Sequence, residues 1–380
     1  MNRKSFIILL GVLLVLGSVA VAVFWQDLNS WRGGNARTGA KPLENLKVND
    51  VAQIHIVDGK DEVTLVAKDG RWAVKQRADY SANYQKLKEL LIKLPDLKIV
   101  QTETVGPALL PRLDLLRPGA DSKNADKSGT VFELTGKSGT VLASMLLGKK
   151  VIKIEDSPLP IKPHTPVGRY VLMPGIGPVL TVSDALNSVE ANPARWLAKE
   201  FFAVARIKSL ASSGQGAPWK ISRSEEYGQW QFADGTGQLD TGAAANAVKA
   251  LESPAFIDVA PEVKRERFGH PRTLVAETFD HLTYTIEIAP KSGSEDYYLS
   301  FAVSGTPPRE RTPEKGEKPE AKARADKQFT EDLKKLDERL AIEKSLTAWT
   351  YVVDGKTLAS VLKDRARFVA PPRRPGAAGR

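Results

Sequence analysis

The chain has 380 residues, a formal net charge of +10, 42% hydrophobic and 26% charged residues, and no cysteine. These proportions are typical of globular proteins, and the length suffices for about two domains beyond an apolar N-terminal segment. The absence of cysteine excludes disulfides, thiol catalysis, cysteine-based metal sites and a lipid-modified N-terminal cysteine.

The first 26 residues predict a transmembrane signal anchor. Phe6 to Trp25 carries no charge, Arg3 and Lys4 precede it, and Asp27 is the first acid after it. About twenty apolar residues in a helix, at ~1.5 Å each, cross a hydrocarbon core of ~30 Å. Because positive flanks stay in the cytoplasm, we expect a single-pass protein of the bacterial cytoplasmic (inner) membrane, with its N-terminus in the cytoplasm and the bulk of the chain extracytoplasmic.

Two alternatives compete with the anchor. Ala20-Val21-Ala22 has the small-x-small form of a signal-peptidase site, so the segment could be a cleaved signal peptide. The apolar run continues to Trp25, a residue that suits the membrane interface, and this favours the anchor. A buried core helix would normally show a polar face, which this run lacks. Residues 27–47 are polar and rich in Gly, Asn and Arg, and predict a flexible linker.

The segment 48–202 predicts a first α+β domain. Asp69-Gly70 stands between two alternating runs and predicts a hairpin, because a type I′ turn needs positive φ at both positions. A helix follows Ser81 and stops at Pro95. One face of this helix carries Tyr84, Leu87, Leu90, Leu91 and Leu94. Further strands are expected at 51–57, 97–100, 130–134, 140–147, 169–173 and 178–182, with helices at 184–189 and 194–202.

The segment 203–363 repeats this order and predicts a second α+β domain. A strand at 205–210, a hairpin at 219–222 and 229–232, a helix at 241–251 and a strand at 256–259 are expected. Trp72 and Trp230 differ by 158 positions (230 − 72), and Pro95 and Pro254 by 159 (254 − 95). Further on, Tyr170 and Tyr351 lie in similar short motifs, at an offset of 181 (351 − 170). We therefore expect an internal duplication of a mostly antiparallel sheet with packed helices.

A charged, proline-rich insertion at 306–346 interrupts the second domain. Thr306 to Gln328 holds four Pro, seven Lys or Arg and five Asp or Glu, which predicts disorder. An amphipathic helix is expected from Phe329 to Ile342, with apolar residues spaced 4, 3 and 4 apart. This helix could pack on its own domain or dock on a partner protein. The hypothesised partner-binding residues are Phe329, Leu333, Leu336 and Leu340.

The last segment, 364–380, predicts a basic disordered tail. Five Arg and no acid lie between Arg365 and Arg380. Such a tail is commonly solvated, but it could also contact anionic lipid, a cell-wall polymer or an acidic partner. Nucleic acid is not expected as a partner, because the anchor would place the tail outside the cytoplasm.

The sequence shows no constellation of residues typical of catalysis. The four His lack the i, i+4 spacing of a helical metal site and the H-E-x-x-H motif; they are His55, His164, His270 and His281. Gly136-Lys137-Ser138-Gly139 has the wrong spacing for a nucleophile elbow, and Gly148-Lys149-Lys150 lacks the Ser or Thr of a P-loop. Gly175-x-Gly177 precedes a strand rather than a helix. We predict no catalytic, cofactor-binding or metal-binding residues.

The order of several short motifs resembles the bacterial domain-of-unknown-function 4340 family. After the N-terminal apolar segment come Asp69-Gly70-Arg71-Trp72, a Leu-rich helix to Leu94, Leu146-Leu147-Gly148-Lys149, Gly168-Arg169-Tyr170-Val171 and Trp196-Leu197. The resemblance covers most of 48–202 and recurs weakly to about Lys363. Members of that family look like membrane-anchored extracytoplasmic proteins and are commonly encoded beside ABC-2-type transporters and the gliding-motility auxiliary component. The resemblance therefore implies an accessory role by association.

The expected function is therefore a non-enzymatic accessory or scaffold role in an ABC-type transport or gliding-motility-like envelope system. The expected partners are the membrane and a protein of the transporter or auxiliary complex, with no cofactor. A binding module for anionic envelope polymers, and an unrecognised hydrolase, are the alternatives. A basic groove would favour the former, and a cleft with converging carboxylates or His the latter.

Overall fold

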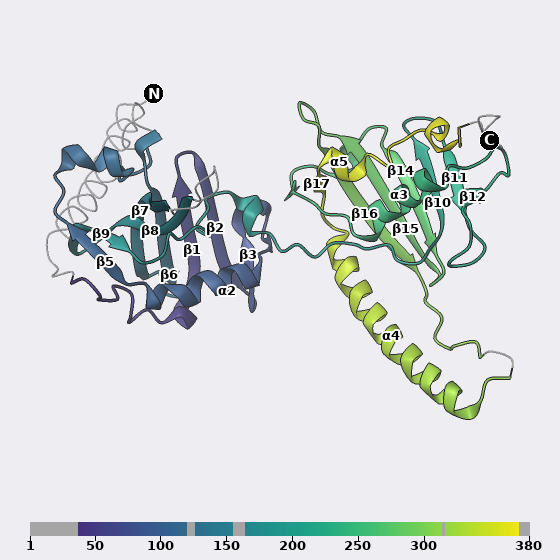
Figure 1. Ribbon diagram of the computed structural model, residues 1–380, viewed down its shortest axis with the longest axis horizontal. Coiled ribbons are helices and arrows are strands. Elements are labelled where there is room, and N and C mark those ends of the chain that lie inside the picture. Colours follow the sequence, from purple (N-terminus) through teal and green to yellow (C-terminus); the bar gives the residue numbers. More distant parts are fainter. Residues whose placement is uncertain (1–36, 120–125, 155–163, 314–315, 372–380) are drawn as a thin grey trace, which may run out of the picture. The chain divides into compact units, whose positions relative to one another are not determined.

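The computed structural model describes residues 37–119, 126–154, 164–313 and 316–371. The chain divides into two compact units, one ending at Ala198 and the other beginning at Lys199. Both are mixed α+β units with one antiparallel sheet and few helices (Figure 1). The unit boundary lies four residues before the predicted one, at 203. The predicted anchor, Phe6 to Trp25, lies outside the described residues, and no helix among the described residues is long and apolar enough to cross a membrane.

The first unit holds a nine-stranded sheet in the order β4-β3-β2-β1-β6-β7-β8-β9-β5. Its strands are β1 (Val51–Asp58), β2 (Asp61–Lys68), β3 (Arg71–Val74), β4 (Tyr80–Ser81), β5 (Ile99–Glu103), β6 (Thr130–Gly136), β7 (Val141–Ile154), β8 (His164–Met173) and β9 (Ile176–Val182). The helix α2 (Tyr84–Lys93) packs on one face and begins after Asn83, whose side chain accepts a hydrogen bond from the Lys86 amide. The expected cap, Ser81, belongs to β4 instead.

The core of the first unit lies between α2 and the sheet. Leu87, Leu90, Leu91 and Leu94 are buried as predicted, whereas Tyr84 is 62% exposed, because it precedes the first full turn that faces the sheet. The Asp69-Gly70 hairpin is confirmed: both residues have positive φ, and Lys68 pairs with Arg71 across the turn. A β-turn with this geometry twists in the same sense as its two strands, and this favours the hairpin.

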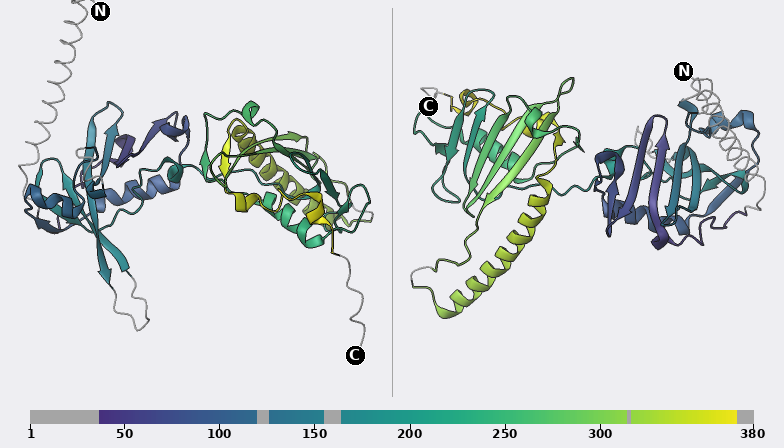
Figure 2. Two further views of the ribbon diagram at one scale, coloured as in Figure 1. Left: turned by 90° about the horizontal axis from the view of Figure 1, so that it is seen from above. Right: turned by 180° about the vertical axis from the view of Figure 1, so that it is seen from behind.

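Strands β7 and β8 extend beyond the rest of the first sheet as a two-stranded ribbon (Figure 2). Strand β7 runs seven residues past the predicted end at Leu147, because Val151 and Ile152 continue the β-branched pattern. The two helices predicted at 184–189 and 194–202 are wrong. Leu186 has a left-handed backbone conformation, and only the 3₁₀ turn Pro193–Trp196 is helical, so the chain cannot continue an α-helix through either segment.

The second unit holds an eight-stranded sheet in the order β12-β11-β10-β14-β15-β16-β17-β13. Its strands are β10 (Ile207–Gly214), β11 (Trp219–Ser222), β12 (Gln231–Phe232), β13 (Asp258–Val259), β14 (Arg272–Thr278), β15 (Leu282–Pro290), β16 (Tyr297–Gly305) and β17 (Tyr351–Val353). Its helices are α3 (Thr241–Glu252), α4 (Pro319–Leu346) and α5 (Gly355–Leu358). Asp240 caps α3 by accepting hydrogen bonds from the amides of Gly242 and Ala243.

The second sheet repeats the strand order of the first, apart from β4. In chain order, three strands, a helix and five strands follow one another in each unit, and they occupy the same places in each sheet. A β-bulge separates Val51 and Gln53 in β1 and, at the corresponding place, Ile207 and Ser209 in β10. The pairing of β2 with β3 and of β11 with β12 aligns Val74 with Phe232, an offset of 158 (232 − 74). The same offset relates Trp72 to Trp230.

The shared order also corrects one predicted equivalence. Tyr170 lies in β8, which corresponds to β16, whereas Tyr351 lies in β17, which corresponds to β9. The predicted match of Tyr170 with Tyr351 is therefore wrong. The mistake arose because neighbouring strands of such a sheet carry similar apolar patterns, and four residues cannot distinguish them.

Two predicted boundaries in the second unit also change. Helix α4 begins at Pro319, within the stretch 306–328 that was expected to be disordered, because its first turns are rich in Ala, Glu, Lys and Arg, which favour helix. The tail from 364 is folded as far as Ala370, and within it Phe368 is fully buried and packs against Trp219 in a tilted arrangement with 4.4 Å between ring centroids. Asp364 accepts a hydrogen bond from Arg272 at 2.9 Å, so the second unit extends past the predicted limit at 363.

Candidate functional site

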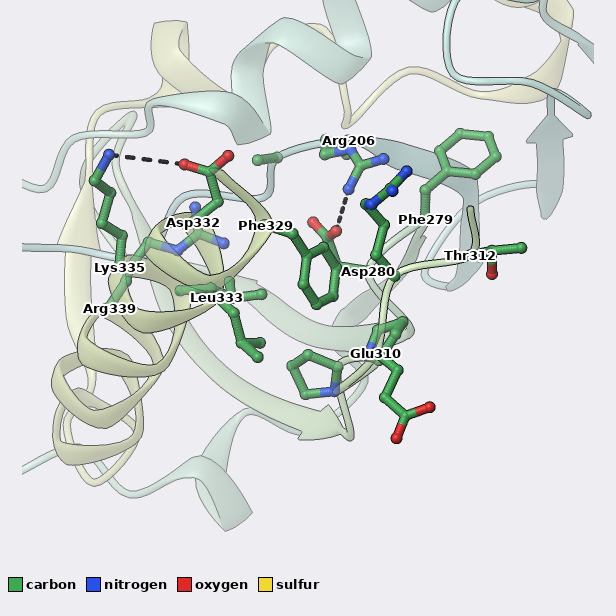
Figure 3. Close-up of a pocket in the computed structure, with 15 residues that line it drawn as sticks. Arg206, Phe279, Asp280, Glu310, Thr312, Phe329, Asp332, Leu333, Lys335 and Arg339 are labelled. Atoms are coloured by element: carbon green, nitrogen blue, oxygen red, sulfur yellow. Dashed lines mark hydrogen bonds and ion pairs between the residues drawn. The ribbon is translucent and has the colours of Figure 1, made fainter. Parts of the chain in front are cut away.

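A cavity of about 640 Å³ lies beside α4 in the second unit (Figure 3). Three stretches that are distant in sequence form its walls. They are the entry to β10 with the turn between β14 and β15, the chain after β16, and one face of α4. Pockets of about 300–1,000 Å³ commonly take small molecules or inserted side chains, and this cavity falls in that range.

The first wall is built around Arg206. Its guanidinium donates two hydrogen bonds of 2.9 Å to the carboxylate of Glu226 and a third to Asp280. The hydrogen bond with Glu226 and the negative charges of Asp280 and Glu226 raise the pKa of Arg206. The same hydrogen bond and the positive charges of Arg206 and Arg223 lower the pKa of Glu226. The Arg206 carbonyl accepts a hydrogen bond from the Phe279 amide at 2.9 Å, which fixes the turn beside it.

The same corner contains two left-handed residues other than glycine. Arg206 has φ +52° and His281 has φ +60°. Such conformations cost roughly 1 kcal/mol or more in residues with a Cβ, and they persist only where surrounding contacts hold them. Gly305, at the end of β16, closes the corner: a Cβ there would lie 2.2 Å from the His281 carbonyl oxygen.

The second wall is the chain that leads from β16 to α4. Pro307 and Pro308 line the cavity, and the arginines that follow tie this chain to the helix. Arg309 pairs with Asp337 at 2.6 Å, and Arg311 pairs with Glu317 at 2.5 Å and Asp326 at 2.9 Å. The pairs with Asp337 and Asp326 join Arg309 and Arg311 to α4, and the described residues 306–313 and 316–346 form an arm that extends from the sheet (Figure 1).

The third wall is the face of α4 that the sequence singled out. Phe329, Leu333 and Leu336 line the cavity and are half-buried. Figure 3 shows Phe329 and Leu333 among the side chains around the cavity. The fourth hypothesised residue, Leu340, does not line the cavity and is only 5% exposed. It packs in its own unit. Three of the four hypothesised residues therefore line the cavity, and the fourth, Leu340, attaches the helix to the unit.

A buried carboxylate completes the anchor of α4. Glu343 is 1% exposed; it accepts a hydrogen bond from the Tyr284 hydroxyl at 2.7 Å and one from the Ala203 amide at 3.1 Å. Burial, and then the hydrogen bond to Glu343, raise the pKa of Tyr284 well above its ordinary value. Charged hydrogen bonds of this kind are worth about 1.5–3 kcal/mol, so the C-terminal end of α4 is firmly held.

Sequence reasoning found the helical wall of the cavity and missed the other two. Arg206, Phe279, Asp280 and the prolines at 307 and 308 had no pattern that linked them, since they come together only through the sheet order. Among the described residues, no group of three or more His, Asp or Glu side chains is arranged to hold a metal ion.

Comparison of the chain with models of known protein families, with curated proteins and with solved structures gave no match.

Proposed function

We propose that this chain is a non-enzymatic, membrane-anchored protein that serves as an accessory or scaffold component of an ABC-type transport or gliding-motility-like envelope system. The uncharged N-terminal segment supports the anchor, and the motifs that resemble the domain-of-unknown-function 4340 family support the association with a transporter or auxiliary complex. Its place is then the bacterial inner membrane, with both folded units outside the cytoplasm.

We also infer that the two units are copies of one ancestral domain. The common strand order, the β-bulge at the same place and the common offset of 158 around the two tryptophans support this inference. An element present in only one of the two copies is a candidate for a function that this copy alone has.

The proposed contact is placed on the arm, because the arm is the largest structural difference between the second copy and the first. Between β8 and β9 of the first unit there is a tight turn at Pro174-Gly175, whereas the corresponding connection of the second unit contains the whole arm. The half-buried side chains of Phe329, Leu333 and Leu336 present apolar surface at the cavity. We assign these three residues to the contact with the partner, and Leu340 to the attachment of the helix.

The contact is tested by changing Leu333 and Leu336 together to Ser in the full chain. We expect the partner to be lost from co-purification while the melting temperature falls by no more than a degree or two, since neither side chain is fully buried. Ile342→Ser is the matched control, because Ile342 lies on α4, is 50% exposed and does not line the cavity. A fall of many degrees in the double variant would make these leucines part of the domain core and would refute the proposed contact.

The transmembrane anchor has a separate test. Proteinase added outside spheroplasts should digest both folded units of the full chain. Protection from the proteinase, or recovery of a soluble protein processed near Ala22, would contradict the single-pass topology.

A further inference from the structure

We propose that the partner segment that enters the cavity is apolar and carries a carboxylate, from an Asp or Glu side chain or a chain terminus, that binds Arg339. This inference rests on the proposed contact through α4 and specifies its chemistry. It follows from which residues build the cavity, and from which of its charges already have partners.

The cavity consists of features that the first copy lacks at the corresponding positions. The turn from β14 to β15 aligns with the turn from β6 to β7, at an offset of 142 (277 − 135 and 283 − 141). Phe279 and Asp280 therefore stand where the first copy has Lys137 and Ser138, and His281 stands where it has Gly139.

The other two walls show the same pattern. Arg206 stands where the first copy has Asp50, one residue before each first strand, and the arm replaces a tight turn. The first unit forms its complete sheet without any of these features. They are thus not required by the fold, and two of them place non-glycine residues at left-handed φ. Strain at positions that the fold does not need is typical of binding sites.

Two of the four cations in the cavity wall are already fully engaged. Arg206 binds Glu226 and Asp280, and Arg311 binds Glu317 and Asp326. Each guanidinium thus has two carboxylates, so neither attracts a further anion. These arginines hold the walls in place.

The other two cations, on α4, are held loosely. Lys335 lies 3.7 Å from Asp332, and the Nε of Arg339 lies 3.6 Å from Glu343, so both pairs exceed hydrogen-bond length. Among the described atoms, the buried Arg339 Nε has no hydrogen-bond partner. This Nε has no exposed surface, so an incoming acceptor reaches Arg339 through the 34% of its side chain that is exposed at the cavity. A carboxylate fits best, because it binds a guanidinium through a charge-assisted hydrogen bond.

The remaining lining determines the rest of the segment. Phe279, Phe329, Leu333, Leu336, Pro307 and Pro308 give the cavity apolar walls. Apolar side chains buried in such a pocket commonly dominate the affinity of a protein contact, while a charge pair fixes its register. The expected segment therefore places one or more large apolar side chains within about a helical turn of its carboxylate.

Photo-crosslinking tests this chemistry in the full chain. A photoreactive amino acid replaces Thr312, an exposed residue at the cavity, in cells that make the protein at its natural level. Mass spectrometry then identifies the cross-linked peptide. We expect an apolar peptide with an Asp, a Glu or a C-terminus within about four residues of the cross-link. A peptide without a carboxylate, a lipid adduct, or a second copy of this chain would overturn the inference.

Charge variants make the test quantitative. Arg339→Gln should lower the cross-linking yield at least tenfold, because the partner's carboxylate then lacks its counter-charge. Arg339→Lys should retain part of the yield, and Arg324→Gln, an exposed position on α4 outside this cavity, should retain all of it. Thermal unfolding of each variant shows whether α4 remains attached.

The variants also separate the two proposals. If Leu333→Ser with Leu336→Ser abolishes cross-linking but Arg339→Gln leaves it unchanged, the contact through α4 stands and the carboxylate is refuted. If neither change affects the yield, the contact itself is refuted.

Discussion

The first and second units differ most where the chain joins their last strands. In the first unit, Met173 pairs with Ile176 across a tight turn, and the sheet continues directly from β8 to β9. In the second unit the same connection extends into the arm, which returns through α4 to Tyr351. The sheet order is unaffected, so the domain tolerates a long insertion at a strand connection. Long surface loops are tolerated because closing a longer loop adds little entropy cost.

The comparison also shows how a cavity can arise without a new fold. The insertion supplied two walls, and changes in one turn and at one residue before β10 supplied the third. The anchor of α4, through Leu340 and Glu343, converts an inserted segment into an ordered wall. The C-terminal end of the arm is thus held by buried contacts, whereas Phe329, Leu333 and Leu336 at the cavity are only half-buried.

The largest expected effect concerns the separate cores of the two copies. Tyr351 is fully buried, with its ring centroid 4.6 Å from that of Phe201 and 5.0 Å from that of Phe256. Tyr351→Ala should destabilise the second unit by about 3–5 kcal/mol, because it leaves a cavity in this aromatic cluster. Calorimetry of the full chain should show that transition at a lower temperature and the transition of the first unit unchanged. Tyr227→Ala, at a residue 95% exposed, is the control and should change stability by less than about 0.5 kcal/mol. An equal shift of both transitions would show that the two copies unfold as one body.

A smaller effect is expected at the attachment of α4, which has no counterpart in the first copy. Tyr284→Phe removes the hydroxyl that donates to Glu343 and leaves the buried carboxylate with one donor fewer. We expect a loss of about 1–3 kcal/mol and faster hydrogen exchange of the last turns of α4. Unchanged exchange in α4 would mean that Leu340 alone holds the helix.

How far the sequence predicted this structure can be judged from particular elements. Asp69-Gly70 and the Leu-rich face of α2 are local signals, and the hairpin and this helix lie where these signals predicted. The helix expected at 241–251 is α3 (Thr241–Glu252). The repeated order of elements was visible in the offset between Trp72 and Trp230, although neither residue lines the cavity.

The errors came from segments whose structure depends on distant contacts. Residues 365–368 were expected to be a solvated tail, but Phe368 packs against Trp219, and Arg365 binds Asp234 at 2.9 Å. The polar first turns of α4 looked disordered, yet Arg311 ties them to the chain after β16. The cavity itself combines residues separated by more than a hundred positions, which local periodicity cannot bring together.

The smallest predicted effect is a pH dependence that belongs to the second copy. The hydrogen bond from Arg206 lowers the pKa of Glu226 in the folded state, so this pair stabilises the protein above the unfolded-state pKa, and its contribution is lost as the pH falls through the lowered folded value. The window therefore lies below about pH 4.5. Glu226→Gln should cost on the order of 0.5–1 kcal/mol at pH 7, as expected for a partly exposed ion pair, and should flatten the acid dependence of the second transition. A first-unit transition that changes with this variant would contradict the assignment.

The most direct test replaces residues 306–346 with Pro-Gly, the turn that the first copy uses between β8 and β9. Circular dichroism and calorimetry of the full-length variant report folding, and co-purification with the partner from the same cells reports function. We predict that both units remain folded and that the partner is no longer recovered. The second unit should melt at a lower temperature, because the buried contacts of Leu340 and Glu343 are lost. Undiminished recovery of the partner from the folded variant would contradict the central claim that the arm of the second copy is the functional contact.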